Sequence, residues 1–309
     1  MGAPSGSELV VGGVAAGRLR YVSAILMPGA PVADAVFTAL QPRIDALLAS
    51  GYTPGLGTIL VGNESASAGY IRMKQAKAAE LGCASPHVHL GDDASQADVL
   101  AAIREFNADP RVDAMLMQHP MPPQIDFDAA LITIDPSKDV DGLHPENVGR
   151  LALGMPGPVS CTPAGIEALL AHYEIPVSGQ EVVILGRGTT LGRPLALLLS
   201  QKRPTANAAV TVVHTGVQNW SDYTRRAGIV IAAAGVPGIL RPEHITPGCV
   251  VVGGGVRYEG RKLLPDVDER CEAVAGWITP RIGGVGPTTI ALLFKNFIDA
   301  AERNAATNR

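Results

Sequence analysis

Residues 182–194 read VVILGRGTTLGRP, an apolar run that ends in a glycine-rich loop and continues with helical spacing. In a strand–loop–helix unit, the free N–H groups and the positive dipole end of the helix attract phosphate. Gly186 and Gly188 would let the backbone approach such a ligand closely, and Gly192 would let the helix pack against the strand. The third glycine comes one residue later than in G-x-G-x-x-G, so the motif alone also fits a plain turn. Its position between an apolar strand and LGRPLALLLS favours a dinucleotide-binding loop.

The segments around this loop alternate between apolar runs and helical patterns. Buried apolar strands separated by helices are typical of a parallel sheet in an α/β protein. Strands are predicted at 56–61, 87–90, 112–118, 181–186, 208–214, 227–235 and 249–255. Helices are predicted at 66–81, 96–107, 161–173, directly after the glycine loop, and at 288–304.

The length of the chain and one change in composition suggest two domains. The chain has 309 residues, and the segment 135–158 is rich in Pro, Gly and Asp, as expected of a crossing between domains. A terminal helix often packs back on the first domain, so we predict one domain from 21–150 plus 288–309 and a second from 151–287, with a cleft between them. Residues 1–20 are glycine-rich and are predicted to be a disordered leader.

Charge and cysteine usage restrict the classes of partner. The net charge is −4 and the isoelectric point is near 6.0, without a strongly basic segment, which argues against nucleic acid and anionic membranes as partners. No apolar run reaches the roughly 18–20 residues of a membrane span. The four cysteines are far apart, the seven histidines are dispersed, and no signal peptide is evident. We therefore predict a cytoplasmic protein without a metal site.

The strand after the glycine loop indicates which dinucleotide would bind. An NAD site usually places Asp or Glu about 20 residues beyond the loop, where it holds the ribose 2′-hydroxyl. Here the strand ends in His214 and Thr215, and Arg187 lies in the loop that would face the same ribose. These three side chains suit a 2′-phosphate, through charge-assisted and hydroxyl hydrogen bonds. The sequence therefore predicts NADP rather than NAD.

Candidate catalytic side chains lie in the first half of the chain. Tyr70 and Lys74 are four residues apart, which places them on one face of the helix predicted there. Gln118 ends the third predicted strand, at the edge where parallel sheets present ligand-binding groups, and KDVDG (138–142) brings two carboxylates into the crossing. Each feature alone also fits a structural role, respectively a solvated helix face, a polar cap and a turn.

Together these segments form an ordered set of motifs that spans most of the chain. The set resembles the bifunctional methylenetetrahydrofolate dehydrogenase/methenyltetrahydrofolate cyclohydrolase family, the FolD family, over about residues 22–304. The motifs are S-x-x-Y-x-x-x-K (67–74), Q-x-P-x-P (118–122), K-D-V-D-G-x-H-P-x-N-x-G-R-L (138–151), C-T-P-x-G (161–165), G-R-x-x-x-x-G-R-P (186–194) and G-G-V-G-P (283–287).

The resemblance implies a catalytic role for four residues. Lys74 matches the family's catalytic lysine, Tyr70 its tyrosine, and Gln118 the glutamine that tunes the lysine. Asp141 matches the aspartate that holds the pterin. Folate would therefore lie between an N-terminal α/β catalytic domain and a Rossmann-type NADP-binding domain, and the protein would form a homodimer through the latter.

The resemblance also implies two binding sets and two coupled reactions. The reactions are NADP-dependent oxidation of 5,10-methylenetetrahydrofolate to the methenyl form and hydrolysis of that product to 10-formyltetrahydrofolate, within one-carbon metabolism and purine biosynthesis. Two alternatives stay open: a non-catalytic paralogue that binds folate or NADP, and an NADP-linked dehydrogenase of another small substrate, of the shikimate or malic type. The cofactor set is Gly186, Arg187, Gly188, Gly192, His214, Thr215 and Val256, and the substrate set is Tyr70, Gln118, Asp141, Gly283, Gly284 and Pro287.

Several positions depart from the family pattern. Arg281 and Ile282 stand where T-P-x-P-G-G has its variable residue and second proline, and Thr288 stands where the family has Met or Leu. Gly253 replaces the Asp of I-D-V-G, and Gly188 replaces a common Ser in the loop. Because the four catalytic positions match, we expect an active enzyme whose two activities are differently balanced.

Overall fold

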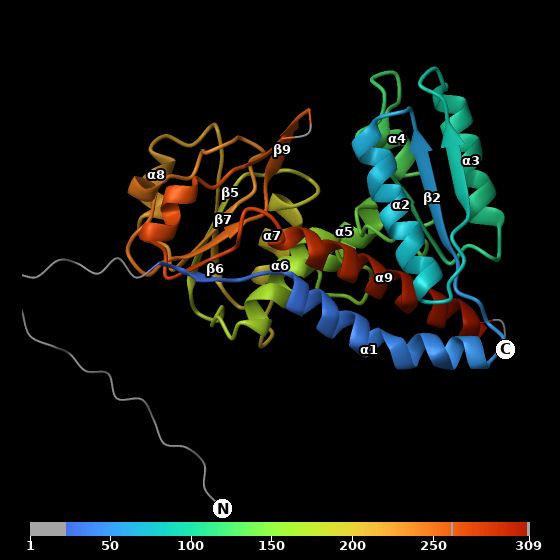
Figure 1. Ribbon diagram of the computed structural model, residues 1–309, viewed down its shortest axis with the longest axis horizontal. Coiled ribbons are helices and arrows are strands. Elements are labelled where there is room, and N and C mark those ends of the chain that lie inside the picture. Colours follow the sequence, from blue (N-terminus) through green and yellow to red (C-terminus); the bar gives the residue numbers. More distant parts are fainter. Residues whose placement is uncertain (1–22, 261, 308–309) are drawn as a thin grey trace, which may run out of the picture.

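The computed structural model describes residues 23–260 and 262–307, so the predicted leader at 1–20 lies outside the described residues. Figure 1 shows two parts, each built around a sheet, with long helices between them. Within the described ranges, no helix is both long and apolar enough to cross a membrane.

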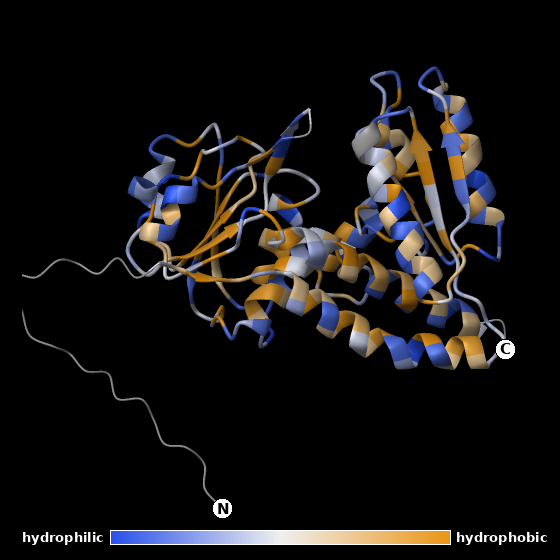
Figure 2. Ribbon diagram, viewed as in Figure 1, coloured by the Kyte–Doolittle hydropathy of each residue, from blue (hydrophilic) through white to orange (hydrophobic). Residues whose placement is uncertain are grey.

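The part that carries the glycine loop is built on a six-stranded sheet with the order β1-β11-β8-β7-β5-β6, in which every pairing is parallel. Its central strands are hydrophobic and almost entirely buried, as expected when helices cover both faces of a parallel sheet (Figure 2). The predicted α/β class with a parallel sheet is confirmed. The strands are β1 (Ile25–Leu26), β5 (Glu181–Leu185), β6 (Ala209–Val213), β7 (Ile229–Ala232), β8 (Val250–Gly253) and β11 (Trp277–Ile278).

The first strand differs from the predicted division of the chain. β1 lies within 21–150, yet it pairs with β11 and thus belongs to the sheet that was predicted from 151–287 alone. The backbone N–H of Ile25 donates to Gly276 O at 2.9 Å, and that of Met27 donates to Ile278 O at 2.8 Å. A strand of two residues has no detectable alternation, so only these long-range hydrogen bonds define it.

The other part contains a three-stranded parallel sheet with the order β3-β2-β4, formed by β2 (Leu56–Val61), β3 (His87–Leu90) and β4 (Ala114–Met117). Helices α2 (Ser65–Glu80) and α3 (Gln96–Ala108) connect these strands, each within a residue or so of the predicted bounds. The shorter helices are α4 (Phe127–Leu131), α5 (Pro145–Ala152), α6 (Cys161–His172), α7 (Gly192–Leu199) and α8 (Trp220–Thr224).

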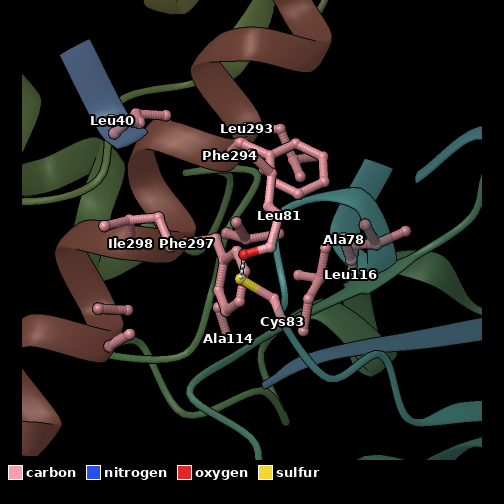
Figure 3. Packing of buried hydrophobic residues seen from close by; sticks show 14 of the residues in the cluster. Leu40, Ala78, Leu81, Cys83, Ala114, Leu116, Leu293, Phe294, Phe297 and Ile298 are labelled. Carbon is pink, nitrogen blue, oxygen red and sulfur yellow. Dashed lines mark hydrogen bonds between the residues drawn. The ribbon is translucent and has the colours of Figure 1, made fainter. Parts of the chain in front are cut away.

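The C-terminal helix α9 (Val285–Thr307) packs against α1 (Ala30–Ala49) and against the three-stranded part. Figure 3 shows Phe294 and Phe297 of α9 with Leu40 of α1 and Leu116 of β4 in one buried cluster. Burying two phenylalanine side chains contributes several kcal/mol to folding, on the order of 1.5–3 kcal/mol each. The last helix of the chain therefore completes the core of the N-terminal part.

Candidate active site

A cleft of about 470 Å³ lies between the two parts. The four predicted catalytic side chains all line one side of it: Tyr70, Lys74, Gln118 and Asp141. The opposite side is formed by the end of β8, by a hairpin and by the loop before α9, which contribute Gly253, Val256, Tyr258, Arg281, Gly283 and Gly284. Segments that are distant in the sequence thus meet at one site.

Lys74 is held by Gln118. Because helical residues four apart share a face, α2 presents Tyr70 and Lys74 together to the cleft. Lys74 Nζ donates to Gln118 Oε1 at 3.1 Å, and Gln118 Nε2 donates to the backbone oxygen of His119 at 2.8 Å, which fixes the amide with its oxygen toward the amine. Burial lowers the pKa of Lys74, and the nearby charge of Asp141 opposes this only in part. The neutral amine is therefore accessible at a lower pH than for an ordinary lysine.

Asp141 faces the cleft because the preceding carboxylate of KDVDG locks the turn. Asp139 Oδ1 accepts from the backbone N–H of Gly142 at 3.1 Å, and Oδ2 accepts from that of His144 at 2.8 Å. Burial raises the pKa of Asp141 to about 6, while the charge of Lys74 acts in the opposite direction. The two carboxylates of the motif thus differ in their surroundings: Asp139 accepts hydrogen bonds from the backbone of the turn, and Asp141 lines the cleft.

Tyr258, which was not predicted from the sequence, lies on the hairpin formed by β9 (Val256–Glu259) and β10 (Lys262–Pro265). Its hydroxyl lies 3.0 Å from that of Tyr70, across the cleft, and this hydrogen bond and burial raise the pKa of Tyr258 to about 12. The alternation in VRYEGRKLLP and the Glu-Gly pair at its centre are the signals that could have predicted a hairpin.

The glycine loop begins where β5 ends, and two of its glycines are required by packing. Gly186 has φ 129°, and a Cβ there would lie 2.1 Å from Ala233 O. A Cβ on Gly192 would lie 2.3 Å from Gly186 O. At Gly188, by contrast, no described neighbour lies within 4 Å of a built Cβ, so packing does not require glycine there.

Arg187 and His214 meet at the ends of β5 and β6. The backbone N–H of Gly216 donates to His214 Nδ1 at 3.1 Å. Arg187 Nη1 lies 3.3 Å from His214 Nε2, so the guanidinium and the imidazole lie together beside the exposed Thr215. Such a pair suits an anion, which would accept from both groups. The residues therefore fit the 2′-phosphate of NADP.

The remaining residues of the predicted substrate and cofactor sets do not all lie in the cleft. Val256, Gly283 and Gly284 line it, whereas Pro287 lies in the first turn of α9 and is not among the described residues that line it. The loop and strand-end residues of the cofactor set lie at the carboxyl edge of the six-stranded sheet, as expected for a dinucleotide site in an open α/β fold.

Two departures from the family pattern have a structural explanation. Arg281 Nη1 donates to Glu269 Oε1 at 3.0 Å and Nη2 donates to Leu263 O at 3.1 Å, so its side chain ties the loop before α9 to β10. Thr288 is fully buried, and a Cβ on Gly165 of α6 would lie 2.4 Å from its hydroxyl. Glycine at 165 therefore lets α6 approach α9 closely around the buried Thr288.

The described residues contain no group of three or more His, Cys, Asp or Glu side chains that could hold a metal ion.

Comparisons with known proteins agree with this geometry. Residues 27–141 match the catalytic domain of the tetrahydrofolate dehydrogenase/cyclohydrolase family, and residues 160–305 match its NAD(P)-binding domain. The bifunctional protein FolD 1 of Salinispora tropica is 63% identical over 281 residues, which cover 91% of this chain and 92% of that protein.

Two solved structures are similar over almost the same range. The FolD methylenetetrahydrofolate dehydrogenase/cyclohydrolase of Campylobacter jejuni is 38% identical with a TM-score of 0.85, and the match covers 91% of this chain and 99% of that one. The Trypanosoma brucei enzyme, solved with NADP and an inhibitor, is 35% identical with a TM-score of 0.83, over 92% of this chain and 99% of that one. The resemblance predicted from the motifs is thereby confirmed, and the chain belongs to the tetrahydrofolate dehydrogenase/cyclohydrolase family.

Proposed function

We propose that the protein oxidises 5,10-methylenetetrahydrofolate with NADP and hydrolyses the methenyl product to 10-formyltetrahydrofolate, with Lys74, Tyr70, Gln118 and Asp141 as its catalytic set. One observation carries the proposal above the others. A lysine with a lowered pKa, fixed by Gln118 and close to the charge of Asp141, lines the cleft that the cofactor-binding sheet also lines.

In the first step, NADP held by the glycine loop, Arg187, His214 and Thr215 would supply the acceptor for the hydride that leaves the methylene carbon of the folate. The demands on the protein are orientation of the substrate and tolerance of the positive charge that develops on it. The carboxylate of Asp141 can accept from the amino and ring N–H groups of the pterin and so orient it. A neutral Lys74 avoids repulsion with the methenyl cation, because its charged form is disfavoured by burial.

The second step adds water to the methenyl carbon. The bond from that carbon to N5 then breaks, N5 takes up a proton as the added hydroxyl loses one, and the formyl group remains on N10. A proton must leave the attacking water, and the neutral amine of Lys74 can accept it while Gln118 Oε1 keeps the nitrogen in place. Tyr70 lies one helical turn away and lines the same cleft, where its ring can contact the folate. The chemistry therefore needs no residue outside the predicted set.

The pH dependence of the two reactions should report the ionisation of Asp141 and of Lys74. Asp141, whose pKa is raised to about 6, is ionised above that pH and loses its charge below it, so the KM for methylenetetrahydrofolate should rise as the pH falls through 6. Hydrolysis should accelerate with rising pH through the lowered pKa of Lys74, because only the neutral amine accepts a proton. Steady-state kinetics between acidic and alkaline pH measures both. A folate KM that is constant through this range would contradict the role of Asp141.

Arg281→Ala should loosen the loop before α9. We expect the KM for methylenetetrahydrofolate to rise about three- to tenfold, with little change in thermal stability, because exposed ion pairs contribute little to folding. Adding Ile282→Pro should reverse part of the effect, since proline restricts the same loop. Unchanged kinetics in Arg281→Ala would show that its two contacts do not hold the loop.

The test of the proposed function is NADP and NAD reduction by the purified protein with methylenetetrahydrofolate, with decay of the methenyl product followed separately. Folate-dependent NADPH formation and hydrolysis support the proposal. Folate binding without either reaction would indicate a non-catalytic paralogue, and NADP reduction that requires another substrate would indicate a different dehydrogenase.

We also propose a cytoplasmic homodimer that supplies one-carbon units for purine biosynthesis. One observation supports the cytoplasmic location and another supports the homodimer. The four cysteines are buried and unpaired by disulfides in the described chain, as in proteins of reducing compartments. β6 forms one edge of the six-stranded sheet, and an open strand edge can pair with a second copy. Light scattering coupled to size-exclusion chromatography measures the assembly.

A further inference from the structure

Asp266 is a fully buried carboxylate outside the catalytic set. Its Oδ2 accepts from the backbone N–H of Ala234 at 2.7 Å and from that of Gly235 at 2.9 Å. Its Oδ1 is buried and has no hydrogen-bond partner among the described residues. Burying a carboxylate costs free energy unless hydrogen bonds compensate for the lost water. Asp266 has such compensation only from two backbone N–H groups of one short segment, which points to a role in holding that segment.

That segment, 233–235, follows β7 and lies between the glycine loop and the cleft. On one side, the backbone N–H of Ala233 donates to Leu185 O at 2.8 Å, and the oxygen of Ala233 lies where a Cβ on Gly186 would stand. On the other side, Gly254, which lines the cleft, donates its N–H to Ala232 O at 2.9 Å. The 233–235 segment thus follows directly on a residue bonded to the cleft wall and lies against the phosphate loop, beside the path of a dinucleotide that would run from one to the other.

Asp266 also fixes the other wall of this passage. Its backbone N–H donates to Gly255 O at 3.1 Å, and a Cβ on Gly255 would lie 2.0 Å from Asp266 Oδ2. The glycine at 255 thus leaves room for the carboxylate to reach the segment after β7. Asp266, which directly follows β10, therefore contacts the loop after β8 through its backbone N–H and the 233–235 segment through its carboxylate.

We infer that Asp266 is a positioning residue for NADP, which holds the 233–235 segment between the phosphate loop and the cleft. This inference rests on the proposed function. Asp266 touches neither folate nor the reacting atoms; it acts through the backbone groups of Ala234 and Gly235. Its loss should therefore affect cofactor binding and leave the hydrolytic reaction, which requires no cofactor, nearly intact.

The test compares Asp266→Ala and Asp266→Asn with Asp113→Asn. Asp113 is a matched control, since it is a buried carboxylate that accepts a backbone N–H, from Gly55 at 2.9 Å, but lies in the N-terminal part. We expect Asp266→Ala to raise the KM for NADP about tenfold or more, while the methenyltetrahydrofolate hydrolysis rate changes less than about twofold. Asp266→Asn keeps an acceptor oxygen and should recover part of the loss. Asp113→Asn should leave the KM for NADP unchanged.

Equal loss of both activities in Asp266→Asn, or an unchanged KM for NADP, would overturn the inference. If Asp266→Ala does not fold, Asp266→Asn decides alone, with NADP affinity measured by calorimetry. Calorimetry also separates this inference from the proposed function. A wild-type protein that binds NADP but turns over no folate would refute the function, whereas weaker NADP binding by Asp266→Asn would still support the positioning role.

Discussion

Lys74→Met is expected to lower the rate of methenyltetrahydrofolate hydrolysis by about a thousandfold, within the range that positioned general bases contribute. Methionine retains the length and apolar character of the lysine stem, so the half-buried site stays filled. It has no amine to accept the proton of the attacking water. The dehydrogenase step needs no such base, and we expect its rate to stay within about tenfold of the wild type.

The control for this variant is Lys77→Met on the same helix. Lys77 pairs with Glu80 at 2.7 Å and lies over the ring of Phe37, away from the cleft lining. The Lys77→Met variant should retain both the dehydrogenase and the hydrolase activity. Folate binding by Lys74→Met, measured by calorimetry, separates a lost base from a lost binding site. Hydrolysis at the wild-type rate in Lys74→Met would refute the role of the lysine.

Arg187→Ala should lower kcat/KM for NADP by roughly 10- to 100-fold, as expected for the loss of a charge-assisted hydrogen bond. The use of NAD, which has no 2′-phosphate, should be almost unchanged, so the ratio between the two cofactors is the discriminating measurement. Arg225→Ala is a suitable control, because Arg225 lies on the surface of the same part and pairs with Asp222. An equal loss with both cofactors would show that Arg187 acts on the loop as a whole rather than on the 2′-phosphate.

The buried parallel strands could be predicted from the sequence because their signal is local. The strand predicted at 112–118 is β4, and Gln118 follows its last residue at the cleft. The helix α1 was not predicted, and Pro42 in its interior is a local signal against a helix. Its packing against α9 outweighs that local preference. Long-range contacts thus stabilise the elements that have no local signal in the sequence.

The candidate site shows the same division. Tyr70, Lys74 and Gln118 could be proposed from spacing, strand ends and motifs, because each occupies a position with a recognisable local pattern. Tyr258 and Asp266 could not, since their significance depends on partners that are distant in the sequence. Tyr258 acts across the cleft on a residue 188 positions away. Such a pairing becomes visible only when the two parts are placed together.

The first strand of the described chain belongs to the C-terminal part, and its last helix packs on the N-terminal part. This arrangement affects how the protein can fold during synthesis. β1 is made some 250 residues before its partner β11. The three-stranded part is made well before α9, which covers its core. The nascent N-terminal part should therefore hold exposed apolar surface until α9 has been synthesised.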